Sequence, residues 1–591
     1  MSKYAALLNQ FVQDEHDAQL KLRRKQWKQP LARRIDTGVA IGGITIVEFD
    51  RDTAKLELTE NLSQFTRGTK LRLSRDDPAG GYVGCVLESE DGIYMTVSPG
   101  PLQSFRKLKR TSGWTLDIDL DDKRRPLMVA LEAVSAGNTR NARQIASILD
   151  GAKADSDLTR DHQVRARVAR IKLDVKQREA VIRGITTGNY WVVQGAPTTG
   201  KTYTLAHLAI TLAREGRRVL ITGPDDFSIN HALRVIHELS GHSPLCKIGS
   251  PNRDEGLGGA AARVHIYESF SISALHPTDR GLIIGALPIT PMLDSSLAAV
   301  EFDAVIIEDA ERVALPDAIA AMLVGKRYIF FGDPAGTPPT IYGEHRRRVL
   351  TQSILSYAGT LTPGTVFGLS FHLNAQLVDF PNKTFYKRRL RAEPSVSNRK
   401  LTLKVKPPWP KFQEILHPAH SSIFIETKHK GCDVISPDEA RVAAWLAVVL
   451  TLGCGVPPEQ VGVISPYRAQ ARLIETGALE LAESRKETLP EDILFGTPED
   501  MRHEGRDVVI VSLTTSDLKR AQARGDDFFS PQRLALTLTR AAVKRIVIAS
   551  PYLLVVKPPL ALADWLSMVR QLAAESKRVS FKIKAPPPPE E

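Results

Sequence analysis

The 591-residue chain carries 79 Lys and Arg residues against 67 Asp and Glu residues, a formal net charge of +12. This length exceeds what one hydrophobic core serves and predicts about three or four domains. A composition of 42% hydrophobic and 25% charged residues excludes a disordered or fibrous chain. The positive charge favours an anionic partner such as nucleic acid, although a solvated basic surface gives the same composition.

The first 165 residues predict a helix, a small β-barrel and further helices. Residues 1–30 place Leu7, Leu8 and Phe11 at helical spacing. From about 37 to 118, apolar and polar residues alternate in short stretches such as "AKLELTE" and "TKLRLSR", with Gly, Asp and Pro clusters between them. Several short strands at this spacing indicate a small barrel. Residues 126–165 return to a helical pattern.

Two later regions predict parallel sheets. Apolar strands alternate with helical segments between 171 and 345, and a second such run occupies 420–570. This βαβ rhythm is typical of a parallel sheet with helices on both faces. We therefore predict an α/β fold with one sheet domain over 166–345, another over 346–575, and a flexible Pro-rich tail over 576–591, where the sequence ends in "APPPPEE".

The cysteines and the N-terminus bear on metal content and compartment. The four cysteines are far apart and form no C-x-x-C pair: Cys85, Cys246, Cys432 and Cys454. We expect no zinc, no iron–sulfur cluster and no disulfide framework, which favours a cytoplasmic location. Residues 1–30 hold acids where a secretory signal needs an apolar core, and the most apolar segment, 440–456, is too short for a membrane span. We expect a buried helix there and no membrane partner.

The strongest local motif is "GAPTTGKT", Gly195 to Thr202, which directly follows the apolar stretch "YWVV" and precedes a helix. It fits the phosphate-binding pattern G-x-x-x-x-G-K-[ST], in which backbone N–H groups around Thr199 and Gly200 cradle phosphates. Lys201 would reach the β- and γ-phosphates, and Thr202 would supply a hydroxyl to Mg²⁺. We predict that this loop binds ATP with Mg²⁺, the alternative being a chance or vestigial match.

A second stretch, "FDAVIIEDAERVALPDA", runs from an apolar strand into Glu308 and Asp309. P-loop ATPases use such a pair to hold Mg²⁺ and aim a water at phosphate, but in the order Asp then Glu. Here Glu308 would hold the metal and Asp309 would be a short-armed base, with Glu311 as a substitute nearby. The alternative is that both acids form a solvated strand end.

A basic stretch over 387–411 separates the two sheet regions. It holds nine cations and one acid, Glu393: Lys387, Arg388, Arg389, Arg391, Arg399, Lys400, Lys404, Lys406 and Lys411. It predicts contact with a nucleic-acid backbone, and the aromatic residues Phe385, Tyr386 and Trp409 among the charges favour that interpretation. A solvated face is the alternative.

In motif order and spacing, the chain resembles the Upf-like group of superfamily 1 helicases, which includes the senataxin type. Gln177 stands where that family reads adenine, and "GPDDFSIN" at 223–230 resembles its backbone-contacting segment. Three later motifs also match: "FGDPAGTPPT" at 331–340, "VISPYRAQ" at 463–470 and "RLALTLTRA" at 533–541. The resemblance implies two RecA-like P-loop domains and, over 1–165, an accessory domain with a helical stalk and a barrel.

The departures from the family pattern concern hydrolysis. The family's γ-phosphate-sensing glutamine is Gly336 here, and its phosphate-binding arginine is His372, next to Phe371, which keeps the aromatic that stacks on adenine. The segment "RHEG" at 502–505 replaces Q-G-x-E, and only Arg540 remains of two catalytic arginines. Together with the exchanged acids, these changes imply impaired hydrolysis.

Two functions stay open on this resemblance. One is an ATP-dependent helicase or translocase, a hydrolase that moves 5′-to-3′ on single-stranded DNA or RNA at a slow rate. The other is a hydrolysis-deficient clamp or complex subunit that uses ATP as a structural switch and works with a protein partner. A P-loop kinase or transporter ATPase is disfavoured, because neither would repeat the sheet or supply "LTLTRA".

Overall fold

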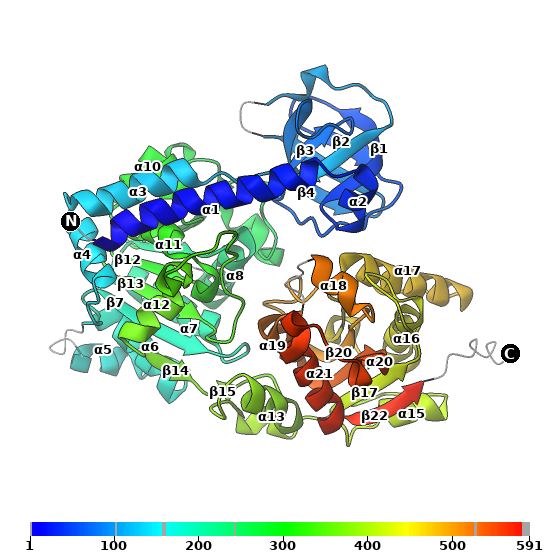
Figure 1. The fold of residues 1–591 in the computed structure, drawn as a ribbon. Helices are drawn as coiled ribbons and strands as arrows, with labels where there is room; N and C mark the ends of the chain where they lie inside the picture. The colour runs from blue at the N-terminus through cyan, green and yellow to red at the C-terminus, as the bar shows by residue number, and fades with distance from the viewer. Residues whose placement is uncertain (1–2, 101–102, 156–160, 242–243, 525–528, 582–591) are drawn as a thin grey trace. The chain divides into compact units, whose positions relative to one another are not determined.

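The computed structural model describes residues 3–100, 103–155, 161–241, 244–524 and 529–581. The chain divides into two compact units (Figure 1). Unit 1 comprises the residues up to Phe367 except Asn61–Gln64 and Pro197–Thr199, which group with the residues from Gly368 onward in unit 2. Each unit contains a large parallel sheet, which confirms the predicted α/β fold.

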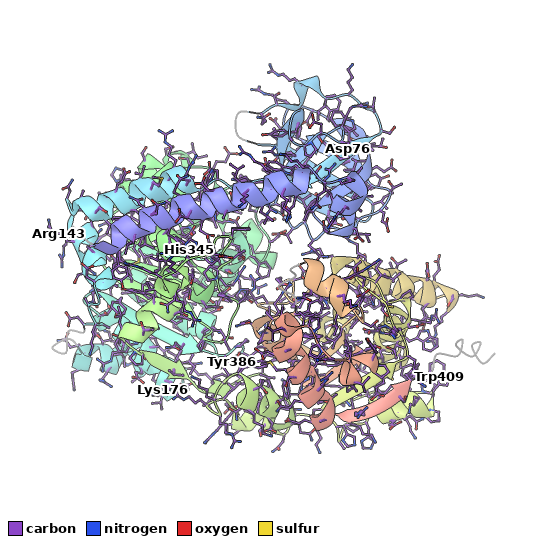
Figure 2. All side chains as sticks on the ribbon, in the orientation of Figure 1. Asp76, Arg143, Lys176, His345, Tyr386 and Trp409 are labelled. Carbon is purple, nitrogen blue, oxygen red and sulfur yellow. The ribbon has the colours of Figure 1, made fainter. Side chains whose placement is uncertain are left out.

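The predicted barrel is present in unit 1. Six strands close in the order β1-β2-β5-β4-β3-β6: β1 Ala40–Phe49, β2 Ala54–Glu57, β3 Lys70–Ser74, β4 Tyr82–Asp91, β5 Tyr94–Pro99 and β6 Trp114–Ile118. Alternate residues such as Leu71 and Leu73 are fully buried inside it, as period-two alternation requires. Arg34 on α2 (Leu31–Asp36) is buried against the barrel and forms ion pairs with Asp117 and with Asp76, which Figure 2 labels.

The sheet of unit 1 has eight parallel strands in the order β10-β9-β11-β8-β12-β13-β7-β14. They are β7 Tyr190–Gly195, β8 Val219–Thr222, β9 Leu245–Ile248, β10 His265–Tyr267, β11 Ile283–Ala286, β12 Ala304–Ile307, β13 Tyr328–Gly332 and β14 Thr365–Phe367. Its longer helices are α6 Val175–Thr186, α7 Lys201–Arg214 and α8 Asp226–Ser240, with shorter ones α5 Asp161–Val168, α9 Thr290–Leu293, α10 Ser295–Ala298 and α12 Ile354–Leu361. Because β14 joins this sheet, the first sheet domain extends past the predicted boundary at 345/346.

The sheet of unit 2 has six parallel strands in the order β19-β18-β20-β21-β17-β22. They are β17 Ser422–Thr427, β18 Val461–Ile464, β19 Leu494–Gly496, β20 Arg506–Ser512, β21 Ala541–Ala549 and β22 Lys577–Phe581. The main helices are α13 Ala375–Thr384, α15 Pro410–Ile415, α16 Pro437–Val448, α17 Arg468–Ser484, α18 Leu518–Arg524, α19 Pro531–Leu538 and α21 Ala563–Glu575.

The predictions of a buried helix from 440 and of a flexible tail from 576 have different outcomes. The apolar segment that begins at 440 forms α16 and a following π-turn at Val449–Gly453, and most of its side chains are buried, as predicted. The flexible tail predicted from 576 is wrong for Lys577–Phe581, which pair with β17 in the sheet. The rest of that tail, 582–591, lies outside the described residues. No helix in the described ranges has the length and apolar character needed to cross a membrane.

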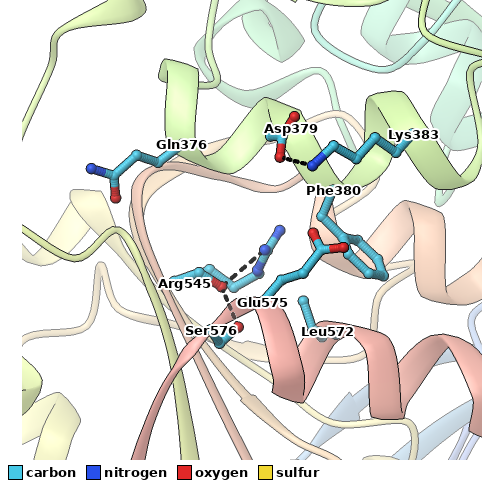
Figure 3. A pocket seen from close by; sticks show the side chains of 9 residues that line it. Gln376, Asp379, Phe380, Lys383, Arg545, Leu572, Glu575 and Ser576 are labelled. Atoms are coloured by element: carbon cyan, nitrogen blue, oxygen red, sulfur yellow. Dashed lines mark hydrogen bonds and ion pairs between the residues drawn. The ribbon is translucent and has the colours of Figure 1, made fainter.

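A cavity of about 320 Å³ in unit 2 lies between α13, β17, β21 and α21 (Figure 3). Arg545 at its wall is 1% exposed, and its Nη2 and Nη1 donate to Ser422 Oγ at 3.0 Å and to the Leu538 carbonyl at 3.1 Å. Burial lowers the pKa of Arg545 to about 10. Asp379 and Lys383 pair with each other across one turn of α13. The charged wall residues therefore have partners within unit 2.

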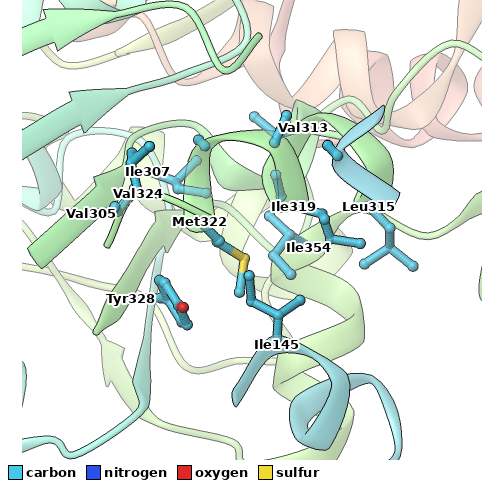
Figure 4. Packing of buried hydrophobic residues seen from close by; sticks show 14 of the residues in the cluster. Ile145, Val305, Ile307, Val313, Leu315, Ile319, Met322, Val324, Tyr328 and Ile354 are labelled. Atoms are coloured by element: carbon cyan, nitrogen blue, oxygen red, sulfur yellow. The ribbon is translucent and has the colours of Figure 1, made fainter. Parts of the chain in front are cut away.

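The N-terminal helices pack on one face of the unit 1 sheet. α1 (Lys3–Trp27) contacts α3 (Arg124–Ala136) and α4 (Arg140–Leu149), and all three contact α11 (Leu315–Met322). Their apolar faces, including Leu8 and Ile145, share one core with Ile319 and the sheet residue Tyr328 (Figure 4). A second core with α6, α7 and α8 covers the other face. This sandwich fixes the ends of β7, β12 and β13, where the residues predicted to bind nucleotide lie.

Candidate nucleotide-binding site

The phosphate-binding motif forms the turn between β7 and α7, as predicted. Gly200 has a left-handed backbone (φ 79°) and directly precedes the first turn of α7, a conformation that glycine adopts without steric cost. Lys201 Nζ donates to the carbonyls of Gly195 at 2.9 Å and Ala196 at 3.1 Å. Its ammonium therefore lies over the loop, and Thr199 in the same motif is fully buried. The loop has the geometry that presents N–H groups and one cation to phosphates.

Gln177, the predicted adenine-contacting residue, lies beside this loop. It belongs to a capping box at the start of α6, in which its Oε1 accepts the Asp174 backbone N–H at 3.1 Å. A Cβ atom on Gly200 would lie only 2.4 Å from Gln177 Nε2. The amide thus contacts the loop backbone, and a side chain at position 200 would displace it.

Glu308 and Thr202 meet at the end of β12. The Thr202 hydroxyl donates to Glu308 Oε1, and Glu308 is fully buried. Among the described residues, nothing donates a hydrogen bond to Glu308 Oε2. Burial, and then the charge of Asp309, raise the pKa of Glu308 to about 8. The alternative of a solvated strand end is therefore wrong.

This pair fits a divalent cation. Mg²⁺ prefers hard oxygen ligands such as a carboxylate and a hydroxyl, and a buried carboxylate oxygen without a donor is costly unless a cation or proton compensates it. Thr202 and Glu308 would hold the ion. The bound ion would neutralise part of the negative charge of the nucleotide phosphates. Lys201 provides the nearby positive charge that already opposes the pKa rise of Glu308.

Asp309 points toward α8. Its backbone is left-handed (φ 47°), which is uncommon for a residue other than glycine. Ser228 Oγ lies 2.8 Å from both Asp309 Oδ2 and Asp225 Oδ1, so its single hydroxyl proton serves one carboxylate at a time. Asp225 also pairs with Arg312 at 2.7 Å. Ser228 lies in the segment predicted to touch nucleic acid, and its contact with Asp309 was not predicted, because sequence spacing alone does not bring these two segments together.

Glu311 lies beside the end of β13, next in the sheet to the P-loop strand β7. It sits in the 3₁₀ turn Ala310–Arg312, is 8% exposed, and its Oε2 accepts the Asp333 backbone N–H at 3.0 Å. Burial, and then the charges of Asp309 and Asp333, hold the pKa of Glu311 well above its usual range. The site therefore contains a third buried carboxyl group in addition to Glu308 and Asp309.

The remaining predicted residues belong to unit 2. Arg540 is 3% exposed, and its Nε donates to the Leu536 carbonyl at 3.0 Å while its Nη1 donates to the Arg502 carbonyl. His372 is half-buried, and burial lowers its pKa. Phe371, by contrast, is 40% exposed. Arg540 would have to give up backbone hydrogen bonds to contact a nucleotide, so its catalytic role stays a prediction.

The basic stretch of unit 2 is mostly exposed. Seven of the nine cations have exposed side chains: Lys387, Arg388, Arg389, Arg391, Lys400, Lys404 and Lys406. Arg399 pairs with Asp507 at 2.6 Å and Lys411 with Glu414 at 2.9 Å. Tyr386 and Trp409, labelled in Figure 2, do not stand free among these charges: Tyr386 is 8% exposed, and Trp409 packs on Phe412. The burial of Tyr386 therefore weakens the support expected from that residue, while the half-buried Trp409 and the row of exposed cations remain.

Comparisons with known proteins find similarity to a family model and to named relatives. A family model described as "AAA domain" matches residues 352–552. "DNA replication ATP-dependent helicase/nuclease DNA2" of Saccharomyces cerevisiae is 24% identical over 413 residues, which cover 64% of this chain and 26% of that protein. "Regulator of nonsense transcripts 1 homolog" of Drosophila melanogaster is 22% identical over 405 residues, covering 61% of this chain and 33% of that protein.

The match spans only part of these relatives, 26% of the yeast protein and 33% of the Drosophila one. Among solved structures, "Crystal structure of Arterivirus nonstructural protein 10 (helicase)" is 12% identical with a TM-score of 0.36, over 88% of this chain and 80% of that chain.

Proposed function

We propose that this chain, a member of the Upf1-like family of superfamily 1 helicases, binds ATP with Mg²⁺ and acts on single-stranded nucleic acid. One observation supports the nucleotide site above all: the P-loop residue Thr202 is hydrogen-bonded to Glu308, whose second carboxylate oxygen is buried and has no donor among the residues that the structure describes. Lys201 would contact the β- and γ-phosphates, and Gln177 would contact the base. The relatives named as ATP-dependent helicases support the same function.

Single-stranded nucleic acid is expected to bind with a steep salt dependence. Each phosphate neutralised by a cation releases counterions, so log affinity should fall linearly with log salt. If four of the seven exposed cations contact phosphates, affinity for a fluorescent oligonucleotide should fall by roughly 30-fold or more between 50 and 200 mM salt. Fluorescence anisotropy at several salt concentrations measures the slope.

A matched pair of variants assigns that slope to the basic stretch. Arg388→Ala with Arg389→Ala removes two exposed cations and should reduce the slope by about two. Arg399→Ala, whose guanidinium already pairs with Asp507, should change it little. A slope near zero in the unaltered protein, or an equal effect of both variants, would rule out backbone contact by these residues.

A second candidate function is the hydrolysis-deficient clamp, favoured by the contacts of Asp309 and Arg540. Asp309 is engaged by Ser228, and Arg540 is held by backbone carbonyls. ATP turnover with and without single strands separates the candidates, with Lys201→Ala as the blank. Turnover stimulated by strands supports the helicase; nucleotide binding with turnover at the Lys201→Ala level supports the clamp.

A further inference from the structure

Glu311 fills a space that two glycines leave open. A Cβ atom on Gly332 would lie 2.4 Å from Glu311 Oε2, and one on Gly336 would lie 2.7 Å from both Oε1 and Cγ of Glu311. Such distances are far below van der Waals contact, so neither position can carry a side chain while Glu311 stays in place. Glu311 can therefore occupy this space only because position 336 carries no side chain.

This arrangement places the Glu311 carboxyl group at the end of the site where the phosphates are expected. The sheet order β12-β13-β7 sets the ends of these three strands side by side, and ligands of parallel sheets bind at such carboxyl ends. Lys201, which reaches the β- and γ-phosphates in P-loop proteins, acts electrostatically on Glu311. Glu311 Oε2 is occupied by the Asp333 N–H, which orients the group and leaves Oε1 next to Gly336.

We infer that Glu311 is the side chain by which this protein distinguishes a nucleoside triphosphate from a diphosphate, through a hydrogen bond from its carboxyl group to the γ-phosphate. This inference rests on the proposed function. The contact would come from the turn after β12, because the position in the turn after β13 where the family has its sensor glutamine is Gly336, which has no side chain.

The electrostatics of the site suit a neutral carboxyl group in this role. Burial, and then the charges of Asp309 and Asp333, raise the pKa of Glu311, and Glu308 lies at the end of β12, before the same turn. A protonated carboxyl group keeps one oxygen as an acceptor for Asp333 N–H and donates its O–H to a phosphate oxygen. Carboxylic acids held neutral by their surroundings act as such donors in enzymes. An ionised carboxylate would instead repel the γ-phosphate.

The test compares Glu311→Gln with Glu311→Met. Both replacements have nearly the same length, but only the amide supplies an acceptor and a donor. Calorimetric titration with ATPγS and with ADP gives the ratio of the two affinities. We expect Glu311→Gln to keep this ratio within about twofold and Glu311→Met to weaken ATPγS binding about tenfold with ADP unchanged, the effect of one hydrogen bond to a charged group. A melting curve of each variant checks that it is folded.

An exchange of positions tests the geometry with a second readout, the melting temperature, beside nucleotide binding. Gly336→Gln alone should lower the melting temperature, because Glu311 occupies the space. Gly336→Gln combined with Glu311→Ala should recover the melting temperature and the preference for ATPγS, because the polar group then comes from the turn after β13.

Several results would overturn the inference. Equal loss of both nucleotides in Glu311→Met would make Glu311 merely structural, and equal loss of the preference in Glu311→Gln and Glu311→Met would show that the charge is required. A Gly336→Gln protein as stable as the unaltered one would contradict the shared space. If the unaltered protein bound neither nucleotide, both the proposed function and this inference would be wrong. If it bound both and Glu311→Met kept the ratio of the ATPγS and ADP affinities, only the inference would be wrong.

Discussion

Replacing Glu308 with glutamine is expected to stabilise the nucleotide-free protein and to abolish its Mg²⁺-dependent nucleotide binding. Glu308 is fully buried beside Asp309, so its ionised form is costly without a cation. The amide keeps an acceptor for the Thr202 hydroxyl and removes the charge. Its new N–H donors offset part of the gain, and we expect a net stabilisation of about 2 kcal/mol at pH 7. Mg²⁺ would lose its charged ligand.

The stabilisation by Glu308→Gln should depend on pH in a defined direction. The pKa of Glu308 rises from 4.5 to about 8 on folding, so between these values the folded state binds more protons than the unfolded state. The stability of the unaltered protein therefore falls as pH rises through this window, relative to a protein without the carboxyl group. The advantage of glutamine should be near zero at pH 4.5 and level off above pH 8.

Thermal denaturation of both proteins without Mg²⁺, from pH 5 to pH 8.5, measures this advantage. Adding Mg²⁺ and ADP should raise the melting temperature of the unaltered protein only, because ligands that bind the folded state stabilise it. A glutamine variant that is less stable at every pH, or that responds to Mg²⁺ and ADP as the unaltered protein does, would remove Glu308 from the metal site.

Replacing Arg34 with methionine is expected to destabilise the barrel by about 3–5 kcal/mol at pH 7, the usual effect of removing one partner of a buried ion pair. Arg34 and Asp117 are each 1% exposed and bonded to each other, and Arg34 Nε also donates to the Gln29 carbonyl at 3.1 Å. Burial raises the pKa of Asp117, and Arg34 opposes that rise. Without Arg34, the Asp117 carboxylate would be buried uncompensated.

Controls on the same helix and strand sharpen the Arg34 prediction. Arg33→Met, one residue earlier on α2 and exposed, should change stability by less than about 0.5 kcal/mol. Asp117→Asn added to Arg34→Met should recover part of the loss, because both charges are then gone. A raised carboxyl pKa lowers stability as pH rises, so the Arg34→Met deficit should be smaller at pH 5 than at pH 7. Hydrogen exchange of β1 and β6 reports these effects; equal exchange in both arginine variants would contradict the account.

Local sequence patterns were sufficient to predict both sheets and the barrel. Continuous apolar runs such as Ala304–Ile307 form central parallel strands buried on both faces, and alternating runs form the barrel. The P-loop and its partner Glu308 were also predictable, because each directly follows a strand of the same sheet. The strand Lys577–Phe581 was missed although "KRVSF" alternates, because the proline-rich sequence after it masked the pattern.

The rest of the site depends on contacts between segments far apart in the sequence. The left-handed turn at Asp309 sends its carboxylate to Ser228 and sets Glu311 against Gly332 and Gly336. No periodicity or motif encodes these distances. The Arg540 guanidinium likewise donates to a backbone carbonyl some forty residues earlier in the chain, and only the folded structure brings the two together.

The most direct test of the nucleotide site is a calorimetric titration of the full chain with ADP and with ATPγS, in Mg²⁺ and in EDTA. The account predicts binding of both nucleotides in Mg²⁺, weaker binding in EDTA because Thr202 and Glu308 lose the ion, and loss of at least about tenfold in affinity in Lys201→Ala, since a charge-assisted contact to phosphate is removed. No heat with either nucleotide on folded protein, or equal affinity in Lys201→Ala, would contradict it.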